Sequence, residues 1–176
     1  MLATNLYRIL GKKTYSDKSI FKNKTSEDDL KETIFSDEVL DYSQKQILEL
    51  DKSFDFNEFL EGAKEAFKII VEAYNTNKLE SVKFLVSKDV YERFNRAIDK
   101  TNKTEKEFNI VSVKASISNI EVTNEQAEIK VEFISNQIEK VSNKTNKLNN
   151  IKDIWTFMKN MNNDTVVWKL VEVGIE

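Results

Sequence analysis

The side chains that most often perform catalysis or bind metals are missing from this 176-residue chain, which contains no histidine and no cysteine. Imidazole is the usual general base and the commonest transition-metal ligand, and the cysteine thiolate is a frequent nucleophile and zinc ligand. Composition therefore excludes Ser/His and Cys/His catalytic pairs, thiolate metal sites and disulfides. We expect neither a structural metal nor a cofactor.

Alternating polar side chains over residues 51–57 are similar to the first half of a calcium-binding loop. Such a loop needs glycine at its sixth position for a sharp turn and a bidentate glutamate at its twelfth. Phe56 and Gly62 stand at these two positions, so the ligand set is incomplete. A helix that begins after Asp55 explains the same residues, because the Asp55 carboxylate can accept backbone N–H groups as an N-cap.

The clearest element that the sequence predicts is this helix. Apolar residues recur at three- and four-residue steps over residues 56–74, which is typical of one buried helical face. Its start carries two further signals. Glu58 is spaced to reach back to the N-cap, and Phe54 is spaced to pack against Phe59.

Shorter helices and then strands are predicted to follow. Apolar groups at 79–85 and 90–98 predict two helices, the second capped by Ser87. Beyond residue 107 the apolar period changes to two, and its phase slips after Ile117 as at a bulge. The predicted strands cover residues 111–122, 127–133, 154–158 and 166–173, with a long hairpin tip at 142–150 and a turn at 160–164. This order predicts an α+β fold with N-terminal helices packed on a bent four-stranded antiparallel sheet.

Charge is distributed unevenly along the chain, although the net charge is only −3. Lys and Arg dominate residues 1–24, whereas Asp and Glu dominate the following segment. We therefore expect three parts: a basic membrane-proximal arm (1–24), an acidic linker with short helices around 30–34 and 39–50 (25–53), and a folded domain (54–176). The residues assigned to contact anionic lipid are Arg8, Lys12, Lys13, Lys18, Lys22 and Lys24.

The aromatic residues allow two interpretations. Core packing is the default role of large apolar side chains. A bent sheet beneath helices often leaves an apolar pocket between the two layers, where a small or acyl ligand could bind. The residues assigned to this possible pocket are Phe67, Ile70, Phe94, Val131, Phe133, Trp155, Phe157 and Trp168.

Ordered segments across residues 54–173 resemble the Tim-forty-four-like (Tim44-like) domain family. Residues 54–74 are similar to the opening helix of the family, and residues 79–94 to its second and third helices. The matches in the sheet are the central strand at Ala127–Phe133 and the closing aromatic hairpin at 153–157 and 168–171. Two positions depart from the family pattern. Lys159 replaces the usual Arg, and residues 164–167 lack the usual Asp-Pro, so the conformation of the hairpin turn stays open.

This resemblance implies a cystatin-like or nuclear-transport-factor-two-like fold, no enzymatic activity, inner-membrane attachment and affinity for anionic lipid. The family includes the peripheral subunit of the mitochondrial import motor. In bacterial relatives a transmembrane helix precedes a segment similar to residues 6–14. We therefore expect a native N-terminal anchor upstream of this chain, with the basic arm on the cytoplasmic or matrix-equivalent face of the inner membrane.

The predicted function is a non-enzymatic, inner-membrane-associated adaptor in protein translocation or membrane tethering, which contacts anionic lipid and a protein client. A pI near 5.3 argues against binding to nucleic acid. One alternative is a small-molecule-binding protein or an isomerase or dehydratase of the same cone-shaped fold, which would need a polar inward side chain where the assigned strand positions are apolar. Another is a structural subunit of a larger assembly. The oligomeric state stays open.

Overall fold

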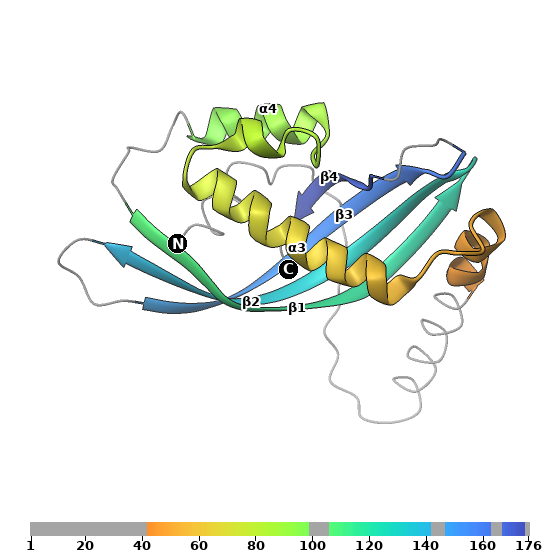
Figure 1. Cartoon of the computed structure of the whole chain (residues 1–176), viewed down its shortest axis with the longest axis horizontal. Coiled ribbons are helices and arrows are strands. Elements are labelled where there is room, and N and C mark those ends of the chain that lie inside the picture. Colours follow the sequence, from red (N-terminus) through yellow and green to blue (C-terminus); the bar gives the residue numbers. More distant parts are fainter. Residues whose placement is uncertain (1–41, 99–105, 142–146, 163–166, 175–176) are drawn as a thin grey trace, which may run out of the picture.

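The computed structural model describes residues 42–98, 106–141, 147–162 and 167–174. A helix over residues 42–50 comes first. It is followed by α3 (Phe56–Asn75), the 3-10 helix η1 (Leu79–Val82), α4 (Lys88–Ile98) and the strands β1 (Lys106–Thr123), β2 (Gln126–Val141), β3 (Lys147–Asn160) and β4 (Lys169–Gly174). Figure 1 shows α3 lying across one face of the sheet, with α4 above it in that view.

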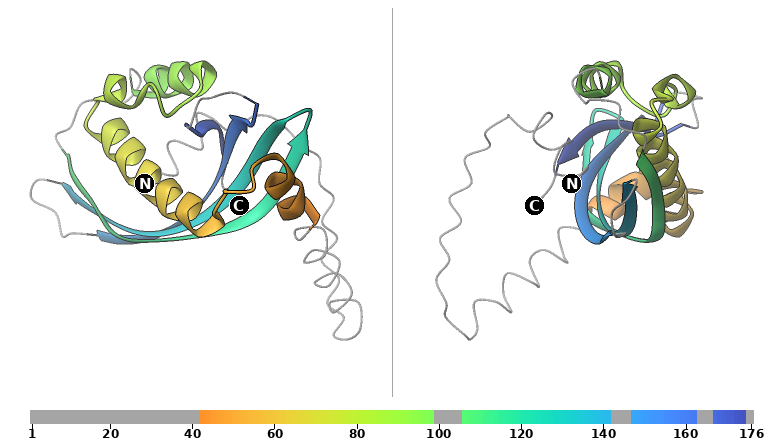
Figure 2. Two further views of the ribbon diagram at one scale, coloured as in Figure 1. Left: turned by 45° about the vertical axis from the view of Figure 1, so that its right-hand side comes forward. Right: turned by 90° about the vertical axis from the view of Figure 1, so that its left-hand side faces the viewer.

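The four strands form one antiparallel meander in the order β1-β2-β3-β4. Asn124 and Glu125 join β1 to β2, and both have positive φ, as a two-residue hairpin turn requires. The long strands curve beneath α3 in the left view of Figure 2. The predicted α+β class, with helices on a bent four-stranded antiparallel sheet, is confirmed.

Bulges interrupt the edge strand β1 at two places. The pairing of β1 with β2 shifts between Ile117 and Asn119, which confirms the predicted phase slip. A second shift lies between Ile110 and Ser112, where alternation alone showed no break. Because each bulge adds a residue to one strand only, it bends the ladder and increases its twist.

The predicted hairpin tip at 142–150 is wrong for its last four residues, which belong to β3. Asparagine favours turns because its side chain bonds to nearby backbone, and the prediction relied on that preference. Here the side chains bond across strands instead. Asn150 Nδ2 donates to Asn136 Oδ1 at 3.1 Å, and Asn136 Nδ2 donates to Ser112 Oγ at 3.0 Å. This polar ladder joins β3, β2 and β1.

Capping residues set the starts of α3 and α4 as predicted. Asp55 Oδ1 accepts the backbone N–H groups of Asn57 at 2.7 Å and Glu58 at 3.0 Å. The Phe54 and Phe59 rings lie 5.9 Å apart, which confirms the predicted contact across the helix start. Ser87 Oγ accepts the Val90 N–H at 3.2 Å at the start of α4.

The core lies between α3 and the sheet. Phe67, in the middle of α3, is fully buried, with its ring 4.6 Å from that of Phe133 and 4.7 Å from that of Trp155. Tyr74 connects α3 to α4 through the Phe94 ring at 5.5 Å. Ile47 of the first described helix is also fully buried in this core. The packed body therefore includes residues upstream of position 54, because a buried Ile47 ties that helix to the domain.

Candidate functional site

A surface groove of about 390 Å³ lies at the start of α3. Four segments form it: residues 51–55 before the helix, the first three turns of α3, Leu85, and the ends of the β3-β4 hairpin. Backbone hydrogen bonds hold the last two together. Leu170 N donates to Leu85 O, and Ser87 N donates to Leu170 O, both at 2.8 Å. The groove is thus built where the helix start meets the closing hairpin.

Aromatic rings make the apolar floor of this groove. Trp168 lies 5.7 Å from Phe54 and 4.9 Å from Phe59, measured between ring centroids. Phe157 contacts Phe59 edge-on at 6.1 Å. Phe157 is buried, whereas Phe54 and Trp168 are half-buried and keep part of their surface open. A ligand can therefore cover aromatic surface here without displacing the core.

Three carboxylates line the groove, at Asp51, Asp55 and Glu58, and together they are called the rim below. Hydrogen bonds from the Ser53 hydroxyl and then its backbone N–H lower the pKa of Asp51, and the charge of Lys159 adds to this effect. Lys159 is the cation among the groove residues. The groove therefore carries more negative than positive charge.

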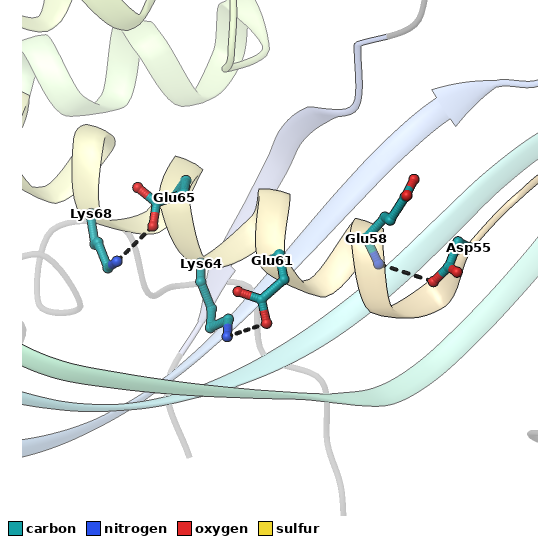
Figure 3. A network of polar contacts seen from close by, with 6 residues as sticks. All are labelled: Asp55, Glu58, Glu61, Lys64, Glu65 and Lys68. Carbon is teal, nitrogen blue, oxygen red and sulfur yellow. Dashed lines mark hydrogen bonds and ion pairs between the residues drawn. The ribbon is translucent and has the colours of Figure 1, made fainter.

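Figure 3 shows how the acidic residues of α3 differ. Glu61 pairs with Lys64 and Glu65 with Lys68, both at 2.6 Å. In Figure 3 the backbone N–H of Glu58, and not its carboxylate, bonds to Asp55, so the second half of the predicted capping box is not formed. Within the part of the chain that the structure describes, Glu58 has no ion-pair partner. Its carboxylate is available at the groove.

Gly62 marks open space inside the groove. It lies in the second turn of α3, and a Cβ atom added there would meet no heavy atom within 4 Å. The backbone at this position is ordinary helix, so a side chain would cause no strain. Gly62 is therefore a position where the groove can be filled by substitution while the fold is kept.

The residues that were assigned to the possible apolar pocket lie in two different places. Phe157 and Trp168 line the groove. The other six are packed into the core, where a ligand would have to replace existing contacts; they are Phe67, Ile70, Phe94, Val131, Phe133 and Trp155. Sequence periodicity identified these side chains as inward-facing, and this does not distinguish a filled layer from an open one.

Four polar side chains are buried in the sheet, at Ser135, Gln137, Asp153 and Thr156. Gln137 Nε2 donates to Ser135 Oγ at 2.8 Å. Asp153 lies opposite Phe133 in the β2-β3 ladder, is only 4% exposed, and burial raises its pKa to about 7. The inward positions of the predicted strands are apolar, but β2 and β3 extend beyond the predicted ranges and carry polar inward residues there. The apolar positions therefore no longer argue against an enzyme. Continuing the period-two alternation of β2 beyond Phe133 would have found Ser135 and Gln137, whereas the burial of Asp153 follows from its pairing with Phe133.

The residues assigned to lipid contact all lie outside the described residues; they are Arg8, Lys12, Lys13, Lys18, Lys22 and Lys24. In the described ranges, no set of three or more His, Cys, Asp or Glu side chains is arranged to hold a metal ion. The helices of those same ranges include none with the length and apolar character needed to span a bilayer.

Comparison with known proteins identifies the domain. A family model described as the Tim44-like domain matches residues 41–175. The chain belongs to the Tim44-like domain family. The match begins at the first described helix, upstream of the domain boundary predicted at residue 54. Tim44-like domains are typically non-enzymatic adaptors, and membership indicates a membrane-associated domain related to protein translocation.

No curated protein matches the sequence. Among solved structures, the Tim44-like domain is similar to the intermembrane space region of the chloroplast protein ARC6. The two share 11% identity with a TM-score of 0.48, over 69% of this chain and 96% of that one.

Proposed function

We propose that this Tim44-like domain is a non-enzymatic adaptor at the inner membrane, in which the basic arm contacts anionic lipid and the groove at the start of α3 binds a protein client. The observation that carries the proposal is the groove itself. It combines an open aromatic floor with a charged rim in a domain whose central core is closed.

The chemistry of the groove suits a protein segment. Partly exposed aromatic rings that surround a concave space are typical of binding sites, and tryptophan is enriched among residues that dominate binding energy. Trp168, Phe54 and Val167 supply such a surface. Val167 is 44% exposed. A volume of about 390 Å³ accommodates a few side chains of a bound segment.

The proposed role of the arm follows from its charge. Each Lys or Arg near an anionic leaflet contributes about 1 kcal/mol of attraction, and physiological salt screens this within about 8 Å. The arm residues 1–24 contain seven acidic or basic side chains, of which one, Asp17, is acidic. We therefore expect the arm to bind anionic vesicles in a salt-dependent way and not to bind neutral vesicles.

Vesicle sedimentation of the full chain tests the arm. We expect replacement of Arg8, Lys12, Lys13 and Lys18 by Gln to abolish most binding to anionic vesicles at low salt. The matched control replaces four body lysines, Lys64, Lys68, Lys83 and Lys88, whose exposed ion pairs contribute little to stability. If the arm variant binds as well as the wild type, or both variants lose binding equally, the arm is not the lipid-binding element.

Site-specific photo-cross-linking in membranes tests the groove. A cross-linking residue at Val167 should yield a discrete adduct that disappears when Gly62→Leu fills the groove. The matched control is Ile69, which is 47% exposed on α3 but does not line the groove. An identical adduct pattern from both positions, or a Val167 adduct that persists in Gly62→Leu, would reject the groove as the client site.

A further inference from the structure

We infer that the groove at the start of α3 selects a client segment by charge: a Lys or Arg side chain of the client is held at the rim of Asp51, Asp55 and Glu58, while an adjacent apolar side chain covers the aromatic floor. This inference rests on the proposed function of the groove as a client site. It adds the chemical class of the bound segment.

Hydrogen-bonding capacity at the rim is the first argument. Both hydrogen bonds to Asp51 end on Oδ1, and both bonds to Asp55 also end on Oδ1. No residue in the described ranges donates a hydrogen bond to the Oδ2 atom of Asp51 or of Asp55. Carboxylate oxygens accept strong, charge-assisted hydrogen bonds from ammonium and guanidinium groups. Asp51 and Asp55 thus keep one such acceptor each while their Oδ1 atoms hold the local backbone in place.

Charge balance is the second argument. Glu61 and Glu65, on the same helix, each have a lysine at 2.6 Å, whereas Glu58 at the rim has none among the described residues. The groove residues comprise three carboxylates and the single cation Lys159. Hydrogen bonds from Ser53 lower the pKa of Asp51, so this carboxylate stays ionised in mildly acidic solution. An anionic segment would be repelled, and a cationic one would be attracted.

The aromatic floor is the third argument. The ring centroids of Phe54, Phe59 and Trp168 lie 4.9 to 5.9 Å apart. A cation next to an aromatic face is attracted by the ring quadrupole, most strongly at tryptophan. Lys and Arg also carry apolar stems that pack on apolar surface while the charged end stays at the water boundary. Rim and floor together therefore match a cationic side chain next to an apolar one.

Fluorescence anisotropy with three labelled peptides tests the inference on the full chain. The first peptide has a Leu-Phe pair flanked by lysines, the second has glutamates in place of the lysines, and the third has alanines in place of Leu-Phe. We expect the first to bind and the other two to bind at least about tenfold more weakly. Higher salt should weaken binding of the first peptide.

Variants of the protein separate charge from shape. Glu58→Lys should weaken binding of the lysine peptide about tenfold, and Glu58→Gln by less. Glu72→Lys makes the same charge change on α3 at an exposed position outside the groove, so it should leave binding unchanged. Gly62→Leu should abolish binding, whereas circular dichroism and melting temperature should show a folded domain in each variant.

The outcomes distinguish the inference from the proposed function. If the lysine and glutamate peptides bind equally and both are lost in Gly62→Leu, charge selection is wrong and the groove remains a client site. Equal weakening by Glu58→Lys and Glu72→Lys also rejects charge selection at the rim. If no peptide binds, or if binding survives in Gly62→Leu, the groove is not a client site and both proposals fail.

Discussion

Aromatic residues gather at two regions along α3 that differ in closure. In its middle, Phe67 is fully buried against Phe133 and Trp155. At its start, Phe54 and Trp168 are half-buried beside the open space at Gly62. The side-chain chemistry is the same in both regions. The surroundings differ, because the middle of α3 faces the long strands β2 and β3, whereas its start meets the end of β3 and a β4 strand that begins only at Lys169.

The largest expected effect tests the closed region. Phe67→Ala should destabilise the domain by about 3–5 kcal/mol, because it removes a large buried side chain and leaves a cavity. Val167→Ala, at the open groove, should change stability by about 0.5 kcal/mol or less. Urea titration of both variants measures the difference. Equal midpoints for Phe67→Ala and the wild type would show that this layer is not closed as described.

Asp153 gives a second test of the difference between the closed core and the open groove, because it is a titratable group buried in the closed region. Burial raises its pKa from 3.8 to about 7, so the folded state favours the protonated form. The contribution of Asp153 to stability is therefore full below about pH 4 and is lost as the pH rises through about 7. Asp153→Asn stays neutral and should gain stability relative to the wild type over this range, by at most about 4 kcal/mol.

Urea titrations near pH 4 and pH 8 measure this shift. Asp51→Asn is the matched control at the groove, because hydrogen bonds lower the pKa of Asp51 and its contribution is lost as the pH falls instead. A stability difference between wild type and Asp153→Asn that does not change with pH would contradict the burial of this carboxyl.

The smallest effect tests the open region. Gly62→Ala should stabilise the domain by about 0.5–1 kcal/mol, because alanine is the better helix former and its Cβ meets no neighbour. Thermal unfolding measures the gain. A loss of stability would mean that the space at Gly62 is occupied, and the difference between the two regions of α3 would disappear.

Several features of the domain follow from local sequence alone. Asp55, Phe54 and Phe59 predicted the start of α3, and Ser87 predicted the start of α4, because caps depend on backbone N–H groups a few residues away. The bulge after Ile117 was visible as a break in period-two alternation. The ordered set of helix and strand patterns also identified the family, whose match to residues 41–175 confirms it.

Other features depend on residues far apart in the chain. Periodicity shows which face of an element is apolar but not what covers it, so it could not distinguish the packed Phe67 from the open Trp168. Asn150 is a turn former by local preference, but it is a strand residue here because it pairs with Asn136 in the β2-β3 ladder, where the two side chains also bond. Asp153 is buried because of its position opposite Phe133, which only strand pairing decides. The sequence by itself determined the elements and their order, whereas tertiary packing decided which apolar surface closes into a core and which stays open as a groove.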